Sequence, residues 1–217
     1  MLEVYKRIQP HIHNTAVLES RLLNEIACCT IFLKCENFQK AGAYKIRGAT
    51  NAILKLSEKD RSRGVVTHSS GNFAQAVSLA AKNLQVPAYI VMPTNAPKIK
   101  KAGTLSYGGI VTECEATIEA RERKSQKIKE TTGATLLHPS NDLDVIYGQG
   151  TASYELFQQA TDFDFIICPV GGGGLIAGTC LYAKHFSPNT KIIGAEPFEV
   201  DDAYRSLISG KIETNTT

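Results

Sequence analysis

Short apolar segments, several of them rich in β-branched residues, alternate with helical patterns along almost the whole chain. Several segments lack the polar alternation of a half-exposed strand, which is typical of strands covered on both faces. Strand–helix–strand order at this spacing predicts an α/β protein with parallel sheets and right-handed crossovers. The predicted strands span residues 29–35, 64–68, 87–92, 110–114, 134–138, 163–170 and 191–196, and the predicted helices span 45–56, 72–84, 98–107, 116–131, 150–160 and 175–185.

Composition excludes several classes of protein. The chain has 217 residues with 43% hydrophobic content, enough to bury a core in one large domain or two small ones. A formal net charge of +3 is too small and too dispersed to indicate a nucleic-acid partner. No uninterrupted apolar run reaches the length of a membrane span, so we expect no membrane insertion.

The cysteines and the N-terminal residues indicate a compartment. The six cysteines include no CxxC pair, so their spacing fits neither a zinc site nor a small disulfide framework. Buried free thiols in a reducing compartment are the favoured interpretation. The first residues lack the basic-then-apolar layout of a secretory signal. We therefore predict a cytoplasmic protein.

Four consecutive glycines, Gly171, Gly172, Gly173 and Gly174, separate a predicted strand from a predicted helix. Their backbone N–H groups are unshielded and lie at the positive end of a helix dipole, which favours a phosphate group. The pattern Gly172-x-Gly174-x-x-Ala177 also fits a dinucleotide fingerprint, with Glu196 about 20 residues further on as a ribose ligand. The glycines alone leave a dinucleotide and another phosphorylated cofactor both open.

Two further segments place reactive side chains where helices begin. Lys45 follows Tyr44 at such a point, and enclosure there would push its amine toward the neutral form that Schiff-base chemistry requires. An exposed first-turn lysine is the alternative. Ser69, Ser70 and Asn72 offer hydroxyl and amide donors beside free N–H groups, which suits a carboxylate. Ordinary helix capping by Ser70 or Asn72 would use the same residues.

In this order on an alternating α/β chain, the three segments resemble the fold-type II pyridoxal-phosphate enzymes, above all the branch of serine racemase and the serine/threonine dehydratases. The resemblance runs from KCENFQKAGAYKIRGA at Lys34 through SSGN and GQGT to the acidic segment near Asp202. It implies a tryptophan synthase β-like fold of two parallel-sheet α/β domains. The large domain would comprise residues 1–63 and 134–217, the small inserted one residues 64–133, and substrate would lie in the cleft between them.

The resemblance also implies a role for each motif residue. Lys45 would form the Schiff base with pyridoxal 5′-phosphate, and Ser70 would be the second catalytic residue, an acid/base on the opposite face of the substrate. The substrate-binding residues would be Ser69, Ser70, Asn72 and Phe73, the two serines receiving the carboxylate. The cofactor-binding residues would be Tyr44, Lys45, Asn72, Gly171, Gly172, Gly173 and Gly174, with Tyr44 against the ring and the glycines around the phosphate.

An acidic segment matches the family's divalent-cation site. Glu196, Asp202 and the carbonyl of Val200 would bind Mg²⁺ or Ca²⁺ through hard oxygen ligands. A plain acidic loop that caps a helix beginning near Ala203 is the alternative. Glu196 cannot serve both a ribose and a metal, so this match weakens the dinucleotide interpretation.

The chain departs from the family pattern in three respects. Phe73 stands where many relatives have a histidine, and Ser140 stands where mammalian-type serine racemases have an asparagine. Family members also run longer, so we expect a C-terminally truncated chain, either a fragment or a natural form. Its large domain would then leave apolar faces uncovered, which a homodimer partner could cover.

The expected activity is that of a pyridoxal-phosphate-dependent carbon–oxygen lyase or amino-acid racemase with a small amino-acid substrate. Lys45 would remove the α-proton of L-serine or L-threonine, and loss of the β-hydroxyl would lead to a 2-oxo acid and ammonia. Reprotonation from the Ser70 side would instead give the opposite enantiomer. Two other classes stay open: a truncated, catalytically silent pyridoxal-phosphate-binding homologue, and an NAD-dependent oxidoreductase that would leave the Lys45 and Ser70 segments unexplained.

Overall fold

The computed structural model describes residues 1–215. The helices are α1 (Leu2–Ile8), α2 (Arg21–Ala27), α3 (Lys45–Lys55), α4 (Glu58–Arg63), α5 (Asn72–Asn83), α6 (Lys98–Ser106), α7 (Ile118–Thr132), α8 (Leu143–Gln159), α9 (Gly174–Phe186) and α10 (Asp202–Ser209). The strands are β1 (Val17–Glu19), β2 (Phe32–Lys34), β3 (Val65–His68), β4 (Ala88–Pro93), β5 (Ile110–Cys114), β6 (Thr135–Leu136), β7 (Phe165–Pro169) and β8 (Lys191–Ala195). Three short 3₁₀ helices lie at Gln9–His11, Glu36–Phe38 and Lys40–Gly42.

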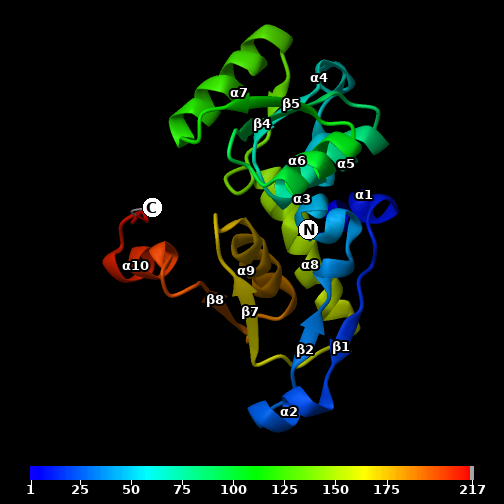
Figure 1. The fold of residues 1–217 in the computed structure, drawn as a ribbon. Coiled ribbons are helices and arrows are strands. Elements are labelled where there is room, and N and C mark those ends of the chain that lie inside the picture. The colour runs from blue at the N-terminus through cyan, green and yellow to red at the C-terminus, as the bar shows by residue number, and fades with distance from the viewer. Residues whose placement is uncertain (216–217) are drawn as a thin grey trace.

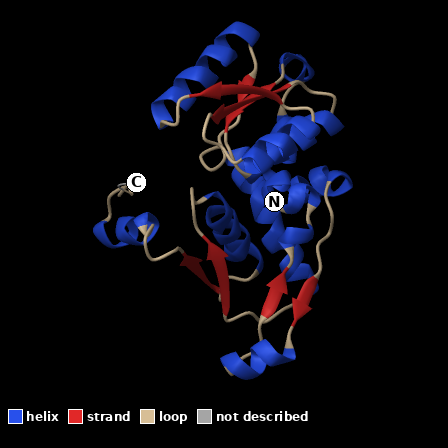
Figure 2. Cartoon of the chain, viewed as in Figure 1, coloured by secondary structure: helices blue, strands red, loops and turns tan. Residues whose placement is uncertain are grey.

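The larger sheet is parallel and runs in the order β5-β4-β3-β6. Helix α7 lies on one face of this sheet, and α5 and α6 lie on the other (Figure 1). A second parallel pair, β7 and β8, packs against α9. Figure 2 shows these two strand groups as separate layers, with helices between them. The α/β class and the parallel sheets predicted from the sequence are confirmed.

The central strands of the larger sheet are buried on both faces. Val65, Val66, Ile90 and Val91 are fully buried, as their unbroken apolar runs predict. One apolar cluster joins this sheet to α1, α3, α5 and α8. Thr135 and Leu136 belong to this sheet, although the predicted division at residue 133 assigns them to the large domain.

The β7–β8 pair differs from the expectation of strands covered on both faces. Ile166 and Cys168 are buried against α9 and α8, whereas Phe165 and Ile167 on the opposite face are 53% and 67% exposed. The pair therefore has one packed face and one open apolar face. None of the helices in residues 1–215 combines the length and the apolar character of a membrane span.

Several helices and strands differ from those predicted from the sequence. The strand predicted at residues 29–35 is only β2, and it pairs antiparallel with β1 rather than entering a parallel sheet. Helices α1, α2 and α4 were not predicted, because each has only six or seven residues and too short an apolar pattern to indicate a helix.

Helix α8 begins seven residues before its predicted start. Asp142 caps it by accepting hydrogen bonds from the amides of Asp144 and Val145. Gly148 therefore lies inside the helix rather than ahead of it, and Gly150 lies in its interior rather than at its first position.

All six cysteines are free thiols, but only Cys35 and Cys168 are buried. Cys28, Cys29 and Cys180 are exposed, so the prediction of buried thiols is wrong for these three.

Candidate active site

Lys45 is the first residue of α3, and its amine is enclosed. The Nζ atom donates to the carbonyl oxygen of Pro139 at 3.2 Å. It also lies 5.1 Å from the centre of the Tyr44 ring and 5.8 Å from that of the Phe73 ring. Burial lowers the pKa of Lys45 from 10.5 to about 8. The alternative of an ordinary exposed lysine is therefore wrong.

Two aromatic side chains from different elements form the walls beside this amine. Tyr44 immediately precedes α3, and burial raises its pKa to about 12, so its hydroxyl stays protonated. Phe73 lies in the first turn of α5 and is 2% exposed. Phe73 therefore contributes an apolar surface where a histidine would have offered a hydrogen-bond donor.

The serine loop links β3 to α5. The Ser69 amide donates to the carbonyl of Val91 at 3.1 Å, and the Ser69 hydroxyl accepts from the Gly71 amide at 3.4 Å. Gly71 is the N-cap residue of α5, and no side chain within residues 1–215 caps this helix. The capping alternative for Ser70 and Asn72 is thus wrong, and the first-turn amides of α5 have no side-chain cap.

Asn72 is exposed, and its Oδ1 accepts a hydrogen bond from Lys100 of α6 at 2.5 Å. Lys100 lies 28 residues further along the chain. Its approach to Asn72 is the contact that the linear pattern did not reveal.

The four glycines form the turn between β7 and α9. Gly173 has φ of 81° and is the N-cap residue of α9, a conformation that glycine adopts at no steric cost. A Cβ atom placed on Gly171 or Gly173 would meet nothing within 4 Å. Within the described residues, the amides of Gly171, Gly172 and Gly173 donate no hydrogen bond to the protein. The turn is therefore an open set of N–H donors at a helix N-terminus.

Residues 138–141 connect Lys45 to this glycine turn. Pro139 offers its carbonyl to Lys45, and the neighbouring Ser140 lies so close to Gly172 that a Cβ there would be 2.6 Å from the serine hydroxyl. Gln149 of α8 also donates to the Pro139 carbonyl at 3.2 Å. The Oε1 atom of Gln149 is buried without a hydrogen-bond partner in the described chain, and it faces Gly174. The Lys45 amine and the open amides of the glycine turn thus lie in one site.

Pro139 and Gln149 were missed as site residues by sequence reasoning. Gln149 lies in the GQGT motif, which entered only as part of the resemblance, and Pro139 was given no role although its segment, His138-Pro139-Ser140, follows a predicted strand and could border the substrate site. Their convergence on one carbonyl oxygen is a property of the fold.

A family of known proteins covers nearly the whole chain. The pyridoxal-phosphate dependent enzyme family matches residues 8–217. The chain belongs to this family.

Relatives in the pyridoxal-phosphate dependent family include enzymes of two reaction types. A serine racemase of Dictyostelium discoideum is 50% identical over 99% of this chain and 66% of its own length. A beta-hydroxyaspartate dehydratase of Paracoccus denitrificans is 47% identical over 98% of this chain and 67% of its own length. The solved structure of maize serine racemase superposes with a TM-score of 0.98 and 48% identity, over 100% of this chain and 66% of that one. The chain thus spans about two thirds of the length of these relatives.

The residues present fit the cofactor that gives the family its name. Pyridoxal phosphate needs an amine that is partly neutral near pH 8, a flat apolar contact for its ring and N–H donors for its phosphate. Lys45, Tyr44 and the glycine turn provide these three features. The group would be held by Lys45 at one end and by residues 171–174 at the other.

The acidic segment does not fit a cation as its side chains lie. Both carboxylate oxygens of Glu196 accept amides of α10, from Ala203 at 3.2 Å and from Tyr204 at 2.9 Å. Asp202 Oδ1 accepts from the Asn215 side chain at 2.7 Å. Residues 1–215 bring no three metal-ligating side chains together. Glu196 thus caps a helix, which is the alternative left open above, and it is not free for a ribose either.

Proposed function

We propose that the protein converts a small β-hydroxy amino acid in a pyridoxal-phosphate-dependent reaction, as a serine/threonine ammonia-lyase, a serine racemase or both. The observation that carries this proposal is the enclosed Lys45 amine, joined through Pro139 and Ser140 to the open amides of the glycine turn. When bound, pyridoxal phosphate supplies an electron sink for the charge left at the substrate α-carbon.

The substrate class follows from what the named relatives share. Serine and β-hydroxyaspartate both carry a hydroxyl group on the β-carbon, and they are the compounds in the names of the two relatives above. Loss of that hydroxyl as water leaves an enamine, and hydrolysis of its imine form gives a 2-oxo acid and ammonia. Return of a proton to the other face instead inverts the α-carbon. One proton abstraction therefore precedes both outcomes.

The chain's own side chains divide the work. Lys45, with a pKa of about 8, has a neutral fraction that can attack a carbonyl and later accept the α-proton. Ser69 and Ser70 lie at the uncapped N-terminus of α5, where a substrate carboxylate would meet hydroxyl and N–H donors. Asn72 and Phe73 complete this end of the site in the proposal. Ser70 is assigned the proton transfer on the face opposite Lys45.

Further parts of the proposal concern organisation. We assign a large domain to residues 1–63 and 134–217 and a small domain to residues 64–133, with substrate between them. We further propose a homodimer and a cytoplasmic location. The Mg²⁺ or Ca²⁺ that the family resemblance predicts at Glu196, Val200 and Asp202 is not part of this proposal, because the Glu196 carboxylate is bound to amides of α10.

The test is covalent capture of the cofactor. The purified chain is incubated with pyridoxal phosphate, treated with borohydride and mapped by peptide mass spectrometry. The adduct is expected on Lys45, and it should be lost in Lys45→Ala but kept in Lys55→Ala, which removes an exposed lysine from the last turn of the same helix. Labelling spread over surface lysines, or equal labelling of Lys45→Ala, would contradict the proposal.

Turnover is measured separately, because binding and catalysis are separable. Formation of 2-oxo acid from L-serine, L-threonine and hydroxyaspartate is followed by its absorbance as a hydrazone, and D-serine by chiral chromatography. Specific capture on Lys45 without either product would favour the catalytically silent homologue over the enzyme.

A further inference from the structure

The turn that brings Pro139 and Ser140 into the site is shaped by a histidine. Residues 139–141 form the turn between β6 and α8, and His138 stands immediately before it. The His138 Nδ1 atom accepts hydrogen bonds from the backbone amides of Ser140 at 3.2 Å and Asn141 at 2.9 Å. The side chain thus binds the backbone two and three residues further on, as the acceptor of an Asx turn does.

These bonds determine the state of the imidazole ring. Two N–H groups pointing at Nδ1 require that this atom carries no proton, so the neutral ring has its proton on Nε2. Burial lowers the pKa of His138, the carboxylates of Glu122 and Asp142 oppose this shift, and the positive charge of Lys45 adds to it. A neutral ring that accepts at Nδ1 is consistent with that direction.

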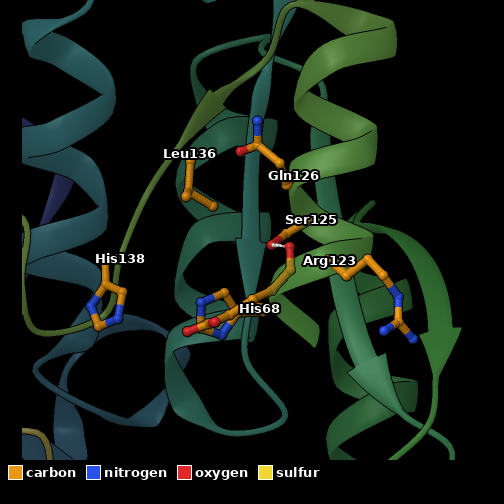
Figure 3. A pocket seen from close by; sticks show the side chains of 7 residues that line it. His68, Arg123, Ser125, Gln126, Leu136 and His138 are labelled. Carbon is orange, nitrogen blue, oxygen red and sulfur yellow. Dashed lines mark hydrogen bonds between the residues drawn. The ribbon is translucent and has the colours of Figure 1, made fainter. Parts of the chain in front are cut away.

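Among the described residues, His138 alone accepts hydrogen bonds from the Ser140 and Asn141 amides of the turn. Figure 3 shows His138 where the chain leaves β6, with His68 across from it and Ser125 and Gln126 of α7 beyond. These residues line a hollow of about 350 Å³. The His68 ring meets the His138 ring edge to face, with centres 5.6 Å apart. His68 therefore packs against the imidazole, but the hydrogen bonds to the turn come from His138.

The turn delivers two groups to the site. Its Pro139 carbonyl lies 3.2 Å from both Lys45 Nζ and Gln149 Nε2, and its Ser140 side chain lies against Gly172. A carbonyl oxygen close to an amine favours the charged form of that amine. A turn that opened would remove this oxygen from Lys45 and change both the charge and the position of the reactive nitrogen.

We propose that His138 is a positioning residue for the site: its Nδ1 atom holds the turn that presents the Pro139 carbonyl to Lys45 and Ser140 to the glycine turn. It touches neither cofactor nor substrate in this role. The inference rests on the proposed function only in taking Lys45 as the reactive amine, and it makes the pKa of that amine depend on a side chain 93 residues away.

The test measures the pH at which the Lys45 amine becomes reactive in the cofactor-free chain. Brief pulses of acetic anhydride over a pH series, followed by peptide mass spectrometry, give the midpoint at which Lys45 becomes reactive. His138→Gln keeps an amide oxygen but moves it beyond the position of Nδ1, and it should shift the midpoint downward by about one pH unit. His138→Asn puts an oxygen near the Nδ1 position, and it should restore the wild-type midpoint.

The matched control is His68→Asn, which removes the other ring of the pair and should leave the Lys45 midpoint unchanged. A wild-type midpoint in a folded His138→Gln variant would overturn the proposal, and so would equal shifts in the Asn and Gln variants. If His138→Gln fails to fold while His138→Asn keeps the wild-type midpoint, the acceptor role is supported. Because pyridoxal phosphate is absent, a failure of the proposed function would not alter any of these results.

Discussion

Replacing Glu155 by glutamine is expected to destabilise the fold more than any comparable change at the surface. Glu155 lies in α8 with its side chain 1% exposed, and its two oxygens accept from Arg47 at 2.9 and 2.7 Å. Lys34 donates to the same carboxylate at 2.8 Å. Arg47, fully buried, also makes paired hydrogen bonds to Glu36 at 2.8 Å each. The cluster therefore holds two carboxylates and two cationic side chains, and their charges cancel.

The magnitude follows from that balance. Glutamine has nearly the shape of glutamate, so the change adds little cavity volume, but it leaves the cluster with one uncompensated positive charge. One oxygen of the Glu155 carboxylate is replaced by an NH₂ group, which faces the N–H donors of Arg47. Breaking a buried ion pair in this way costs about 3–5 kcal/mol. We therefore expect Glu155→Gln to lower the free energy of unfolding by about that amount.

Urea unfolding followed by circular dichroism measures this loss. With a slope of about 1–3 kcal/mol per molar urea, the midpoint should fall by more than about 1 M. The control is Glu25→Gln, which breaks an exposed i,i+4 pair with Arg21 and should cost about 0.3–0.5 kcal/mol. If Glu155→Gln unfolds within about 1 kcal/mol of the wild type, the cluster does not stabilise the fold as argued.

The stability that Glu155 contributes should depend on pH, in a direction set by the pKa of its carboxyl group. Burial pushes the pKa of Glu155 upward, but hydrogen bonds and charge from Arg47, and then from Lys34, outweigh it and hold the pKa below the ordinary value of 4.5. A depressed carboxyl pKa contributes stability above the unfolded-state pKa and loses it as pH falls through the folded-state value. The difference between wild type and Glu155→Gln should thus be full at neutral pH and shrink below about pH 4.5.

Three further outcomes are expected. Gly150→Ala should lower the free energy of unfolding by about 1–3 kcal/mol in thermal or urea unfolding, because its Cβ would lie 2.7 Å from the Gly178 carbonyl oxygen. Gly171→Ala, where a Cβ would meet open space, should stay within about 0.5 kcal/mol of the wild type, and equal losses would contradict the packing argument. Lys45 should reach half-maximal acylation near pH 8, about two and a half units below an ordinary lysine. A midpoint near pH 10 would refute its enclosure. Chelation by EDTA, or millimolar Mg²⁺, should leave the melting temperature unchanged, because Glu196 is bound to α10; a rise with Mg²⁺ would show that its carboxylate can release those amides.

Local signals predicted the elements that carry the reactive residues. Helix α3 begins at Lys45 as predicted, β3 ends at His68, and α5 begins at Asn72. In each case a short apolar run or a turn residue next to the boundary specifies the change of structure. The glycine turn was predicted for the same reason, since four adjacent glycines between a predicted strand and a predicted helix indicate a turn.

Contacts between distant segments were beyond the sequence pattern. Lys45 and Pro139 are 94 residues apart, and Arg47 and Glu155 are 108 residues apart. Nothing in the residues around Arg47 distinguishes a buried, doubly paired guanidinium from a solvated one on a helix. The capping role of Glu196 was one of two interpretations that its sequence allowed, and only the position of α10 decides between them.

The error at α8 shows what the glycines of this chain do beyond the turn. Glycine in a helix interior weakens the helix by about 1 kcal/mol, which is why Gly148 and Gly150 indicate a boundary in the sequence. In the fold, a Cβ on Gly148 would lie 2.5 Å from the Arg47 carbonyl of α3, and one on Gly150 would meet Gly178 of α9. Gly148 and Gly150 thus lower the helix propensity of α8, but their lack of a side chain allows α3 and α9 to pack closely against it.

That close approach positions the site. Helix α3 begins with Lys45, α9 begins at the glycine turn, and α8 lies between them while presenting Gln149 to the carbonyl that also binds the Lys45 amine. The Arg47–Glu155 pair also links α3 to α8: Arg47 is the residue next to Gly48, and Glu155 lies seven residues, about two turns, beyond Gly148. The Lys45 amine is on α3 and the glycine turn precedes α9, and both helices pack against α8. The distance between the amine and the turn therefore depends on α8 residues that have no binding or chemical role of their own. A substitution in α8 should therefore alter the distance between Lys45 and the glycine turn.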